Sequence, residues 1–325
     1  MGEEKLDYWR DKAVLVTGAA GFIGSHLTER LVQLGSRVRA FVRYNSTNSY
    51  GLLDLLPARI RQKFEIVTGD IVDASSIQSA LEGMEIVFHM AALPSIPYSF
   101  RNPRHVFLVN TYGTMNLLLA AGEMGVERIV LASSAGASEK RSLTSPYVTS
   151  KAAMEKLGVG FFQSKSASVT TVRLFNNYGP RQSARAVIPT IISQALVKDD
   201  VHLGNIEPRM DFNYVSDSID AFIRTAQYRT TDGRILTWGT GLFTSIRDVA
   251  HMVFTLIGRP GLHIVREEKR VRPYSGPGDS LSEEVLQTRE LLDLAPKVDL
   301  NEGLEKTISW ISDNIGLYKT DLYAV

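Results

Sequence analysis

One glycine-rich stretch near the N-terminus decides the fold, and it reads Thr17-Gly18-Ala19-Ala20-Gly21-Phe22-Ile23-Gly24. The apolar run 13–16 precedes it, and an amphipathic segment, 25–34, follows it. A strand, a glycine turn and a helix in this order form a site for dinucleotide phosphates, because the helix N-terminus offers free N–H groups and the positive end of its dipole. The first glycine allows the tight turn, the second admits the pyrophosphate, and the third lets the helix pack on the strand. The alternative is a glycine-rich surface turn.

Apolar runs typical of strands alternate with helical patterns through the first half of the chain. The expected strands are 13–17, 37–43, 64–68, 85–89, 128–133 and 169–174, and the expected helices are 22–34, 75–81, 105–123 and 147–165. This alternation predicts an α/β fold with a doubly wound, Rossmann-like parallel sheet.

The second half is less regular and predicts a smaller substrate-binding α/β subdomain over the strand ends. Helices are expected at 186–197, 245–257 and 301–314, and a loop at 272–278. We expect residues 1–175 to form the dinucleotide-binding domain, with 212–244 returning to it. Residues 176–211 and 245–325 would then form the substrate-binding subdomain.

Composition excludes several classes of function. The chain has 325 residues, is 44% hydrophobic and carries a net charge of +1, so it can bury a large core and has no charge excess that favours nucleic acid or a membrane surface. It contains no cysteine, which rules out disulfides and thiolate chemistry, and its six histidines show no metal-binding spacing. No apolar run is long enough for a membrane span and the first residues lack the apolar core of a leader, so a cytoplasmic protein is expected.

The candidate catalytic residues are Tyr147, Lys151 and Ser134. Tyr147 and Lys151 are four residues apart at the start of an expected helix and therefore share one helical face. A nearby ammonium favours the phenolate, which lets a tyrosine act as acid and base. Ser134 follows the fifth expected strand and is positioned to hydrogen-bond the reacting oxygen. The alternatives are a solvated helix pair for the first two and a local backbone cap for Ser134.

The end of the second expected strand bears on which nicotinamide cofactor binds. NAD sites usually place a carboxylate there for the ribose 2′-hydroxyl. This chain instead has Arg43, followed by Asn45 and Ser46. A guanidinium pairs well with a 2′-phosphate, so the pattern favours NADP slightly over NAD. The alternative is a surface arginine with NAD held by neutral contacts.

Taken together, these motifs resemble the extended short-chain dehydrogenase/reductase family. The match includes Gly69-Asp70, Ala91-Ala92, Asn110, the stretch 175–181 and the stretch 211–217. Within that family the chain is most similar to nucleotide-sugar 4,6-dehydratases of the legionaminic-acid pathway type, which act on UDP- or GDP-N-acetylglucosamine. The resemblance implies a homodimer that pairs helices 105–123 and 147–165.

The resemblance and the motifs assign residues to two ligands. The expected cofactor-binding residues are Gly18, Ala20, Gly21, Phe22, Ile23, Arg43, Asn45, Ser46, Asp70, Ile71, Ala91, Ala92, Asn110, Ser133, Tyr147 and Lys151. The expected substrate-binding residues are Ser95, Tyr98, Asn176, Arg185, Arg209 and Arg272. For Asn110 the alternative is an ordinary polar helix residue, and for Arg185 and Arg272 it is a solvated surface arginine.

The implied reaction begins with oxidation of a nucleotide sugar at C4, where the tyrosine takes the hydroxyl proton and bound nicotinamide takes the hydride. An epimerase returns the hydride to the other face, whereas a 4,6-dehydratase eliminates water across C5–C6. The sequence therefore predicts an epimerase or 4,6-dehydratase. The alternatives are a 4-ketosugar reductase and a non-catalytic NAD(P)-binding homologue.

Two departures from the family pattern lie near the expected substrate. Family dehydratases have Thr-Ser-Glu or Thr-Asp-Glu after the fifth strand, but this chain has Ser134-Ala135-Gly136, which is closer to the epimerase pattern. Glu139 is a candidate replacement for the missing glutamate. The family also has an arginine directly before Asp211, where this chain has Met210 and displaces Arg209 by one position.

Overall fold

The computed structural model describes residues 7–140, 145–165, 167–271 and 282–320. Its largest element is a seven-stranded sheet in the order β10-β6-β5-β4-β1-β2-β3, in which every neighbouring pair is parallel. The strands are β1 (Ala13–Thr17), β2 (Arg37–Arg43), β3 (Phe64–Gly69), β4 (Ile86–His89), β5 (Arg128–Ser134), β6 (Val169–Leu174) and β10 (Ile235–Trp238). This is the doubly wound Rossmann-like sheet that the sequence predicts.

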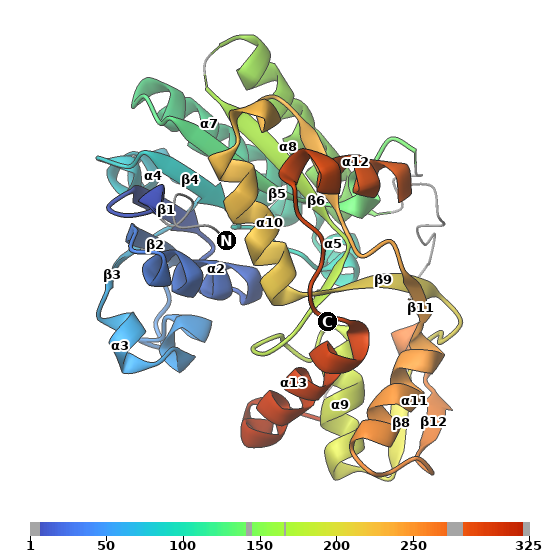
Figure 1. Ribbon diagram of the computed structural model, residues 1–325. Coiled ribbons are helices and arrows are strands. Elements are labelled where there is room, and N and C mark those ends of the chain that lie inside the picture. Colours follow the sequence, from blue (N-terminus) through green and yellow to red (C-terminus); the bar gives the residue numbers. More distant parts are fainter. Residues whose placement is uncertain (1–6, 141–144, 166, 272–281, 321–325) are drawn as a thin grey trace.

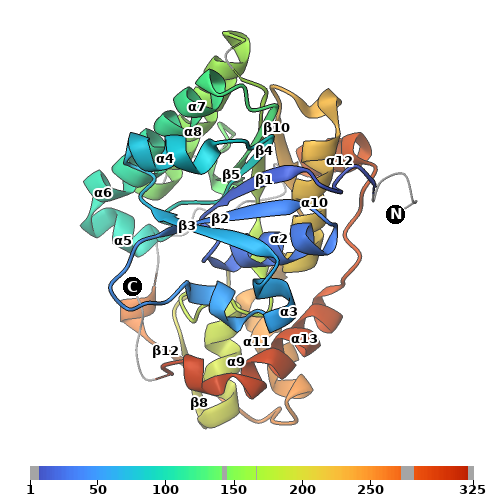
Figure 2. The ribbon, with the colours of Figure 1, turned by 90° about the vertical axis from the view of Figure 1, so that its left-hand side faces the viewer.

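Helices cover both faces of the sheet (Figures 1 and 2). One face carries α2 (Phe22–Gln33), α10 (Val215–Gln227) and α12 (Ser282–Leu292), with the short α3 (Ala58–Arg61) beside α2. The other carries α4 (Ala74–Leu81), α7 (Gly113–Glu123) and α8 (Pro146–Gln163), with α5 (Ile96–Arg101) and α6 (Pro103–Phe107) at its end.

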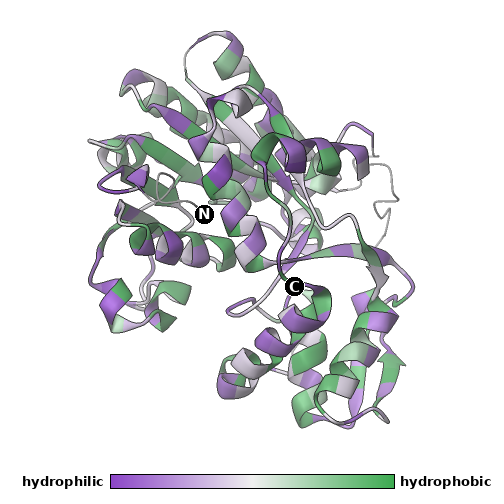
Figure 3. Ribbon diagram, in the orientation of Figure 1, coloured by the Kyte–Doolittle hydropathy of each residue, from purple (hydrophilic) through white to green (hydrophobic). Residues whose placement is uncertain are grey.

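The alternation of side chains along a strand builds these two layers. In β1, Val14 and Val16 face the α2 side, and Leu15 faces the α4 side. All five residues of β1 are buried, as expected for a central parallel strand that is covered on both faces. In Figure 3 the helices around the sheet carry both hydrophobic and hydrophilic residues.

A second hydrophobic core lies beyond the carboxyl ends of the strands, and we call this part the cap. It contains β7 (Asn176–Tyr178), β9 (Arg209–Tyr214) and β11 (Phe243–Ser245) in one small sheet, and β8 (Asp200–Leu203) and β12 (His263–Arg266) in another. Three helices pack around them, namely α9 (Val187–Val197), α11 (Ile246–Leu256) and α13 (Leu300–Asp313). No helix among the described residues is long and apolar enough to cross a membrane.

The expected elements of the first half are present, and most of their ends lie within one residue of the expected ones. The expected helix 105–123 differs, because a π-helical turn, Leu108–Tyr112, joins α6 to α7. This wide turn places Asn110 inside the molecule. The expected loop at 272–278 lies outside the described residues.

Candidate active site

A cavity of about 1080 Å³ opens between the carboxyl ends of the sheet strands and the cap. This is where ligands bind in open α/β sheets. The predicted site residues that line it are Gly18, Ala20, Gly21, Phe22, Ile23, Arg43, Asp70, Ile71, Ala91, Ala92, Ser95, Ser133, Ser134, Tyr147, Lys151, Asn176 and Arg185. The described residues predicted for the site that do not line it are Asn45, Ser46, Tyr98, Asn110 and Arg209. Arg272 lies outside the described residues.

The glycine turn at the cavity floor fits a dinucleotide. Gly18 has φ +65° and lies so close to β4 that a Cβ there would be 2.6 Å from the Ala91 nitrogen. A Cβ on Gly24 would be 2.2 Å from the Gly18 carbonyl oxygen. Gly21, the N-cap of α2, provides no side-chain cap, so the first N–H groups of that helix are left for an anion. The turn can therefore hold a pyrophosphate against the α2 dipole.

At the far end of the cavity, Arg43 is exposed where β2 ends. Asp70 lies beside it after β3, and its Oδ1 accepts a hydrogen bond from the Val72 N–H at 3.1 Å. Asn45 is used by its own loop, because its Nδ2 donates to the Ser49 carbonyl at 2.7 Å and its Oδ1 accepts from the Thr47 N–H at 3.0 Å. Of the three residues expected to contact a 2′-phosphate, only Arg43 lines the cavity.

Tyr147 and Lys151 lie in the first turns of α8, which begins at Pro146. Ser145 caps this helix by accepting the Val148 N–H at 3.2 Å. Lys151 is only 4% exposed, and its Nζ donates to the Ala132 carbonyl of β5 at 2.7 Å. Burial lowers the pKa of Lys151 to about 8, against an opposing effect of the Glu155 carboxylate.

Tyr147 is paired with Ser134. Burial raises the pKa of the Tyr147 phenol to about 12, while a hydrogen bond with the Ser134 side chain opposes this rise. The Ser134 oxygen also accepts the Gly136 N–H at 3.3 Å. The structure therefore shows the local cap that was the alternative for Ser134, and its role toward the reacting oxygen stays a prediction. In the described protein it is Ser134, not Lys151, that lowers the pKa of the phenol, because the Lys151 ammonium is turned toward Ala132.

Two residues that were expected to contact the ligands bond to neighbouring residues of the protein instead. The Tyr98 hydroxyl is turned to His105 Nδ1, at 2.7 Å, instead of the cavity. Asn110 is fully buried and joins two walls of the site, since its Oδ1 accepts the Leu93 N–H at 2.8 Å and its Nδ2 donates to the Ser150 hydroxyl at 2.9 Å. It thereby fixes the segment that carries Ser95 relative to α8.

Acidic side chains are scarce in this cavity. Asp70 is the only carboxylate among the described residues that line it. Glu139 does not reach the cavity, because its side chain is 75% exposed and pairs with Lys156 on the outside of α8. The structure thus does not support Glu139 as a replacement for the missing glutamate.

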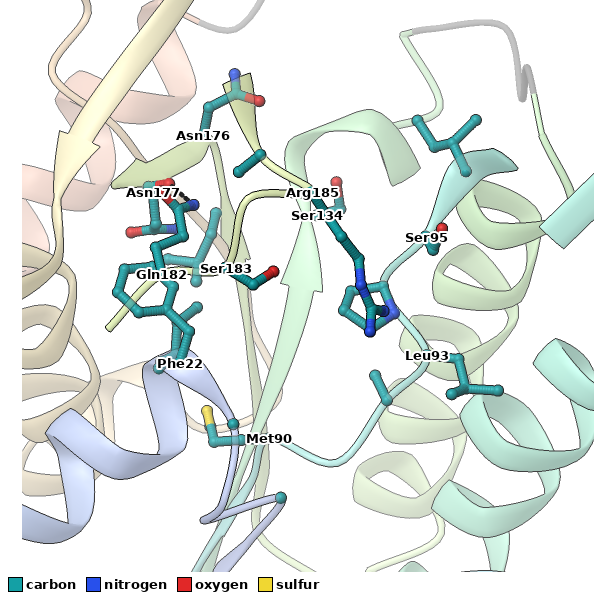
Figure 4. Close-up of a pocket in the computed structure, with 18 of the residues that line it drawn as sticks. Phe22, Met90, Leu93, Ser95, Ser134, Asn176, Asn177, Gln182, Ser183 and Arg185 are labelled. Carbon is teal, nitrogen blue, oxygen red and sulfur yellow. Dashed lines mark hydrogen bonds between the residues drawn. The ribbon is translucent and has the colours of Figure 1, made fainter. Parts of the chain in front are cut away.

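The cap side of the cavity is cationic. Arg185, in the loop before α9, extends into the cavity toward the segment that carries Leu93 (Figure 4). Arg209 points elsewhere, because it is exposed on β9 and donates to the Phe243 carbonyl at 2.6 Å, while Met210 lines the cavity in its place. Asn176 lines it from β7.

Sequence reasoning missed several cavity residues. Gln182 and Ser183 line the wall beside Phe22 and Asn177 (Figure 4), and their position directly after the family stretch 175–181 is the signal that could have found them. His105, Arg181 and Arg270 also line the cavity. Nothing in the local sequence distinguishes Arg270 from other surface arginines.

Arg181 fixes the loop after β7 to the dinucleotide helix. It is 6% exposed, has φ +70° and pairs with Glu29 of α2 at 2.8 Å. His26, one turn earlier, accepts from Arg181 through Nδ1 and donates from Nε2 to the Pro180 carbonyl at 2.9 Å. Burial and the adjacent guanidinium lower the pKa of His26 to about 3, so the ring is neutral and can serve both bonds.

Comparison with known proteins gives a consistent result. The family model described as GDP-mannose 4,6 dehydratase matches residues 15–307. The UDP-glucose 4-epimerase of Mycolicibacterium smegmatis is 32% identical, over 91% of this chain and 97% of its own. The dTDP-D-glucose 4,6-dehydratase of Mus musculus is 30% identical, over 95% of this chain and 91% of its own.

Among solved structures, MoeE5 in complex with UDP-glucuronic acid and NAD superposes with a TM-score of 0.79 at 30% identity, covering 93% of this chain and 99% of its own. The family-model match over residues 15–307 includes the glycine turn, the helix that carries Tyr147 and Lys151, and most of the cap. The chain therefore belongs to the extended short-chain dehydrogenase/reductase family and is an enzyme of its NAD-dependent nucleotide-sugar epimerase/dehydratase group.

Proposed function

We propose that this enzyme is a nucleotide-sugar 4-epimerase that acts on a UDP-hexose or UDP-N-acetylhexosamine. The observation that carries this proposal is the composition of the reacting end of the cavity. Tyr147 and Ser134 both line it there, whereas Asp70, the only carboxylate among the described lining residues, follows β3 at the end where Arg43 lies. One acid–base group is sufficient for C4 epimerisation, because the same proton leaves and returns.

The chain's own residues supply the proton chemistry and the positioning. Tyr147 takes the C4 hydroxyl proton and returns it after the 4-keto sugar has presented its other face. Ser134 donates a hydrogen bond that favours the phenolate, and Lys151 places a positive charge in the same wall of the cavity. The bound nicotinamide supplies the acceptor and donor for the C4 hydride. The glycine turn and the start of α2 hold its pyrophosphate.

Dehydration is the second candidate, and the family model and the mouse relative favour it. Loss of water across C5–C6 needs a base for the C5 proton and an acid for the leaving C6 hydroxyl, in addition to Tyr147. Ser134-Ala135-Gly136 supplies no carboxylate for this, and Glu139 is engaged with Lys156. We therefore rank epimerisation first.

The substrate class follows from the charges of the cavity. Arg185 lines it from the cap, and so do Arg181 and Arg270, which also pair with Glu29 and Glu267. Guanidinium groups bind phosphate and carboxylate oxygens in a bidentate manner. This supports a nucleoside diphosphate as the substrate handle, with Arg185 as the first candidate contact. MoeE5 was solved with UDP-glucuronic acid and with UDP-glucose, so acidic and neutral sugars both belong in a test.

For the cofactor, we propose that the site accepts NADP as well as NAD. Arg43 supports this, because it lines the cavity from the end of the second strand, where NAD-specific sites carry a carboxylate. Asn45 and Ser46 give no further support.

We also propose that the enzyme is a homodimer. Leu108, Tyr112 and Leu119 are each more than two-fifths exposed along the π-helical turn and α7, and Phe162 is 36% exposed on the adjacent α8. An apolar stripe of this kind on two neighbouring helices suits a four-helix contact.

The test is incubation of the purified protein with UDP-glucose, UDP-N-acetylglucosamine and UDP-glucuronic acid, followed by NMR of the sugar. A C4 epimer supports the proposal, and a 4-keto-6-deoxy product would replace it with dehydration. Stoichiometric consumption of reduced nicotinamide with a 4-keto sugar would instead identify a reductase.

Tyr147→Phe provides the matching residue test. We expect it to lower kcat by about 10²–10⁴-fold, because it removes the acid–base group. Tyr98→Phe is the control, since that hydroxyl is turned to His105, and it should retain most of the activity. Equal turnover by Tyr147→Phe and the native enzyme would exclude the mechanism.

A further inference from the structure

A buried ion pair lies directly behind Lys151. Glu155 follows Lys151 by one helical turn on α8 and is 2% exposed. Arg173 of β6 binds it through two parallel hydrogen bonds, from Nε to Oε1 at 2.9 Å and from a terminal nitrogen to Oε2 at 2.8 Å. Because burying an ion pair costs desolvation energy, this arrangement needs a reason besides stability.

Glu155 and Lys151 are both tied to the end of β5. The Lys151 ammonium donates to the carbonyl of Ala132, and the hydroxyl of the next residue, Ser133, donates to Glu155 Oε1 at 2.6 Å. Ala132 and Ser133 of β5 therefore bind Lys151 and Glu155, which lie on successive turns of α8. The carboxylate cannot move without breaking the contacts that also define the cavity wall.

The pair is connected to the far edge of the sheet. Arg173 also approaches Glu284 of α12 at 3.6 Å. Glu284 in turn accepts the Thr237 hydroxyl at 2.9 Å and pairs with Lys140 at 3.1 Å. Arg173 is therefore shared by two carboxylates, which leaves part of the Glu155 charge to act on Lys151.

The other titratable groups around Lys151 do not supply a negative charge. Tyr147, one turn earlier on α8, is a neutral phenol whose pKa burial raises to about 12. His89 of β4 is fully buried, and burial and the Lys151 charge lower its pKa to about 3, so it stays neutral. Glu155, one turn after Lys151 on α8, is the carboxylate whose charge acts on Lys151, and Arg173 holds it from β6.

We propose that Glu155 is a positioning residue for catalysis: held by Arg173 and Ser133, its carboxylate keeps Lys151 as an ammonium ion in the wall of the active site. This inference deepens the proposed function and rests on it for its kinetic consequence. Lys151 lines the cavity and must carry its charge there to bind anionic groups of a ligand. The carboxylate opposes the loss of the Lys151 proton that burial promotes.

The test uses Glu155→Gln and, as a milder change of the same network, Glu284→Gln. Competitive labelling of lysines with trace acetic anhydride, resolved by mass spectrometry across pH, reports the Lys151 titration without any substrate. We expect the midpoint of the Lys151 titration to fall by about one pH unit in Glu155→Gln and by less in Glu284→Gln. Both variants remove a negative charge, and the Glu284 charge lies farther from Lys151 than the Glu155 charge. Glu139→Gln, an exposed carboxylate paired on the outside of α8, is the matched control and should not shift it.

The alkaline limb of the kcat/KM profile for the substrate identified above should move to lower pH by the same amount, and Glu155→Asp should restore part of the shift. If circular dichroism shows that Glu155→Gln does not fold, the Lys151 titration in Glu284→Gln decides whether the inference holds. An unchanged Lys151 midpoint in every folded variant of this pair would overturn the inference. A shifted midpoint without turnover of any nucleotide sugar would support it while rejecting the proposed reaction.

Discussion

At the scale of a residue, Ser134 has the most direct link to the chemistry. Its hydroxyl is the group that opposes the rise of the Tyr147 pKa caused by burial. We expect Ser134→Ala to raise that pKa further, so that the phenolate fraction and kcat/KM fall by about 10-fold at neutral pH. Measurement of kcat/KM at pH 7 checks this. Ser134→Thr keeps the hydroxyl and should retain a value close to the native one, whereas an unchanged kcat/KM in Ser134→Ala would contradict the role.

Arg43 is the residue at which cofactor choice can be measured. Arg43 lines the cavity from the end of β2, and under the proposed binding of NADP the Arg43→Ala change should weaken NADP binding by about 10-fold or more while changing NAD binding little. Dissociation constants of both cofactors by calorimetry give the comparison. Arg39→Ala is the control, because that arginine lies on the same strand but pairs with Glu65 at 2.7 Å. A parallel loss of affinity for both cofactors would show that Arg43 does not distinguish them.

At the scale of elements, the sequence predicts those strands, turns and helices whose backbone geometry requires particular residue types. The glycine turn, its strand and its helix are found as expected because each glycine is fixed by a close backbone approach. Strand β10 has only four residues at the edge of the sheet, and the short strands of the cap have three to six, so their periodicity is too brief to recognise.

Side-chain direction is the part that the sequence could not supply. Tyr98 and Arg209 belong to elements next to the cavity, yet neither side chain lines it. The Tyr98 hydroxyl bonds to His105, and the Arg209 guanidinium donates to the Phe243 carbonyl. Asn110 faces inward because of a π-helical turn, which adds one residue to the helical repeat and is not visible as a pattern. Tertiary contacts decide each of these directions.

The exposed stripe on the π-helical turn, α7 and α8 carries a prediction of its own. Leu119→Glu on α7 places a charge in the middle of the proposed helix contact and should convert a dimer into a monomer. Light scattering after size-exclusion chromatography checks this. Leu286→Glu, at an exposed leucine on α12 away from the stripe, is the control and should leave the mass unchanged. A native protein that already elutes as a monomer would contradict the proposed contact.

At the scale of the whole molecule, the active site exists only where two cores meet. The sheet side contributes Tyr147, Lys151 and the glycine turn, and the cap contributes Asn176 and Arg185. The Arg181–Glu29 pair and the His26–Pro180 bond join these sides directly at the first turns of α2. Under the proposed function, cofactor and substrate would share this wall, and a change in the loop 179–186 should affect the binding of both.

The chain passes between the two cores several times, and this limits which parts recombination can exchange. After β6 the chain enters the cap, returns to the sheet with α10 and β10, leaves again for α11, comes back with α12 and ends in α13. No single cut divides the polypeptide into one core and the other. A recombination event with one breakpoint therefore cannot exchange the whole cap for that of a relative without also replacing part of the sheet domain.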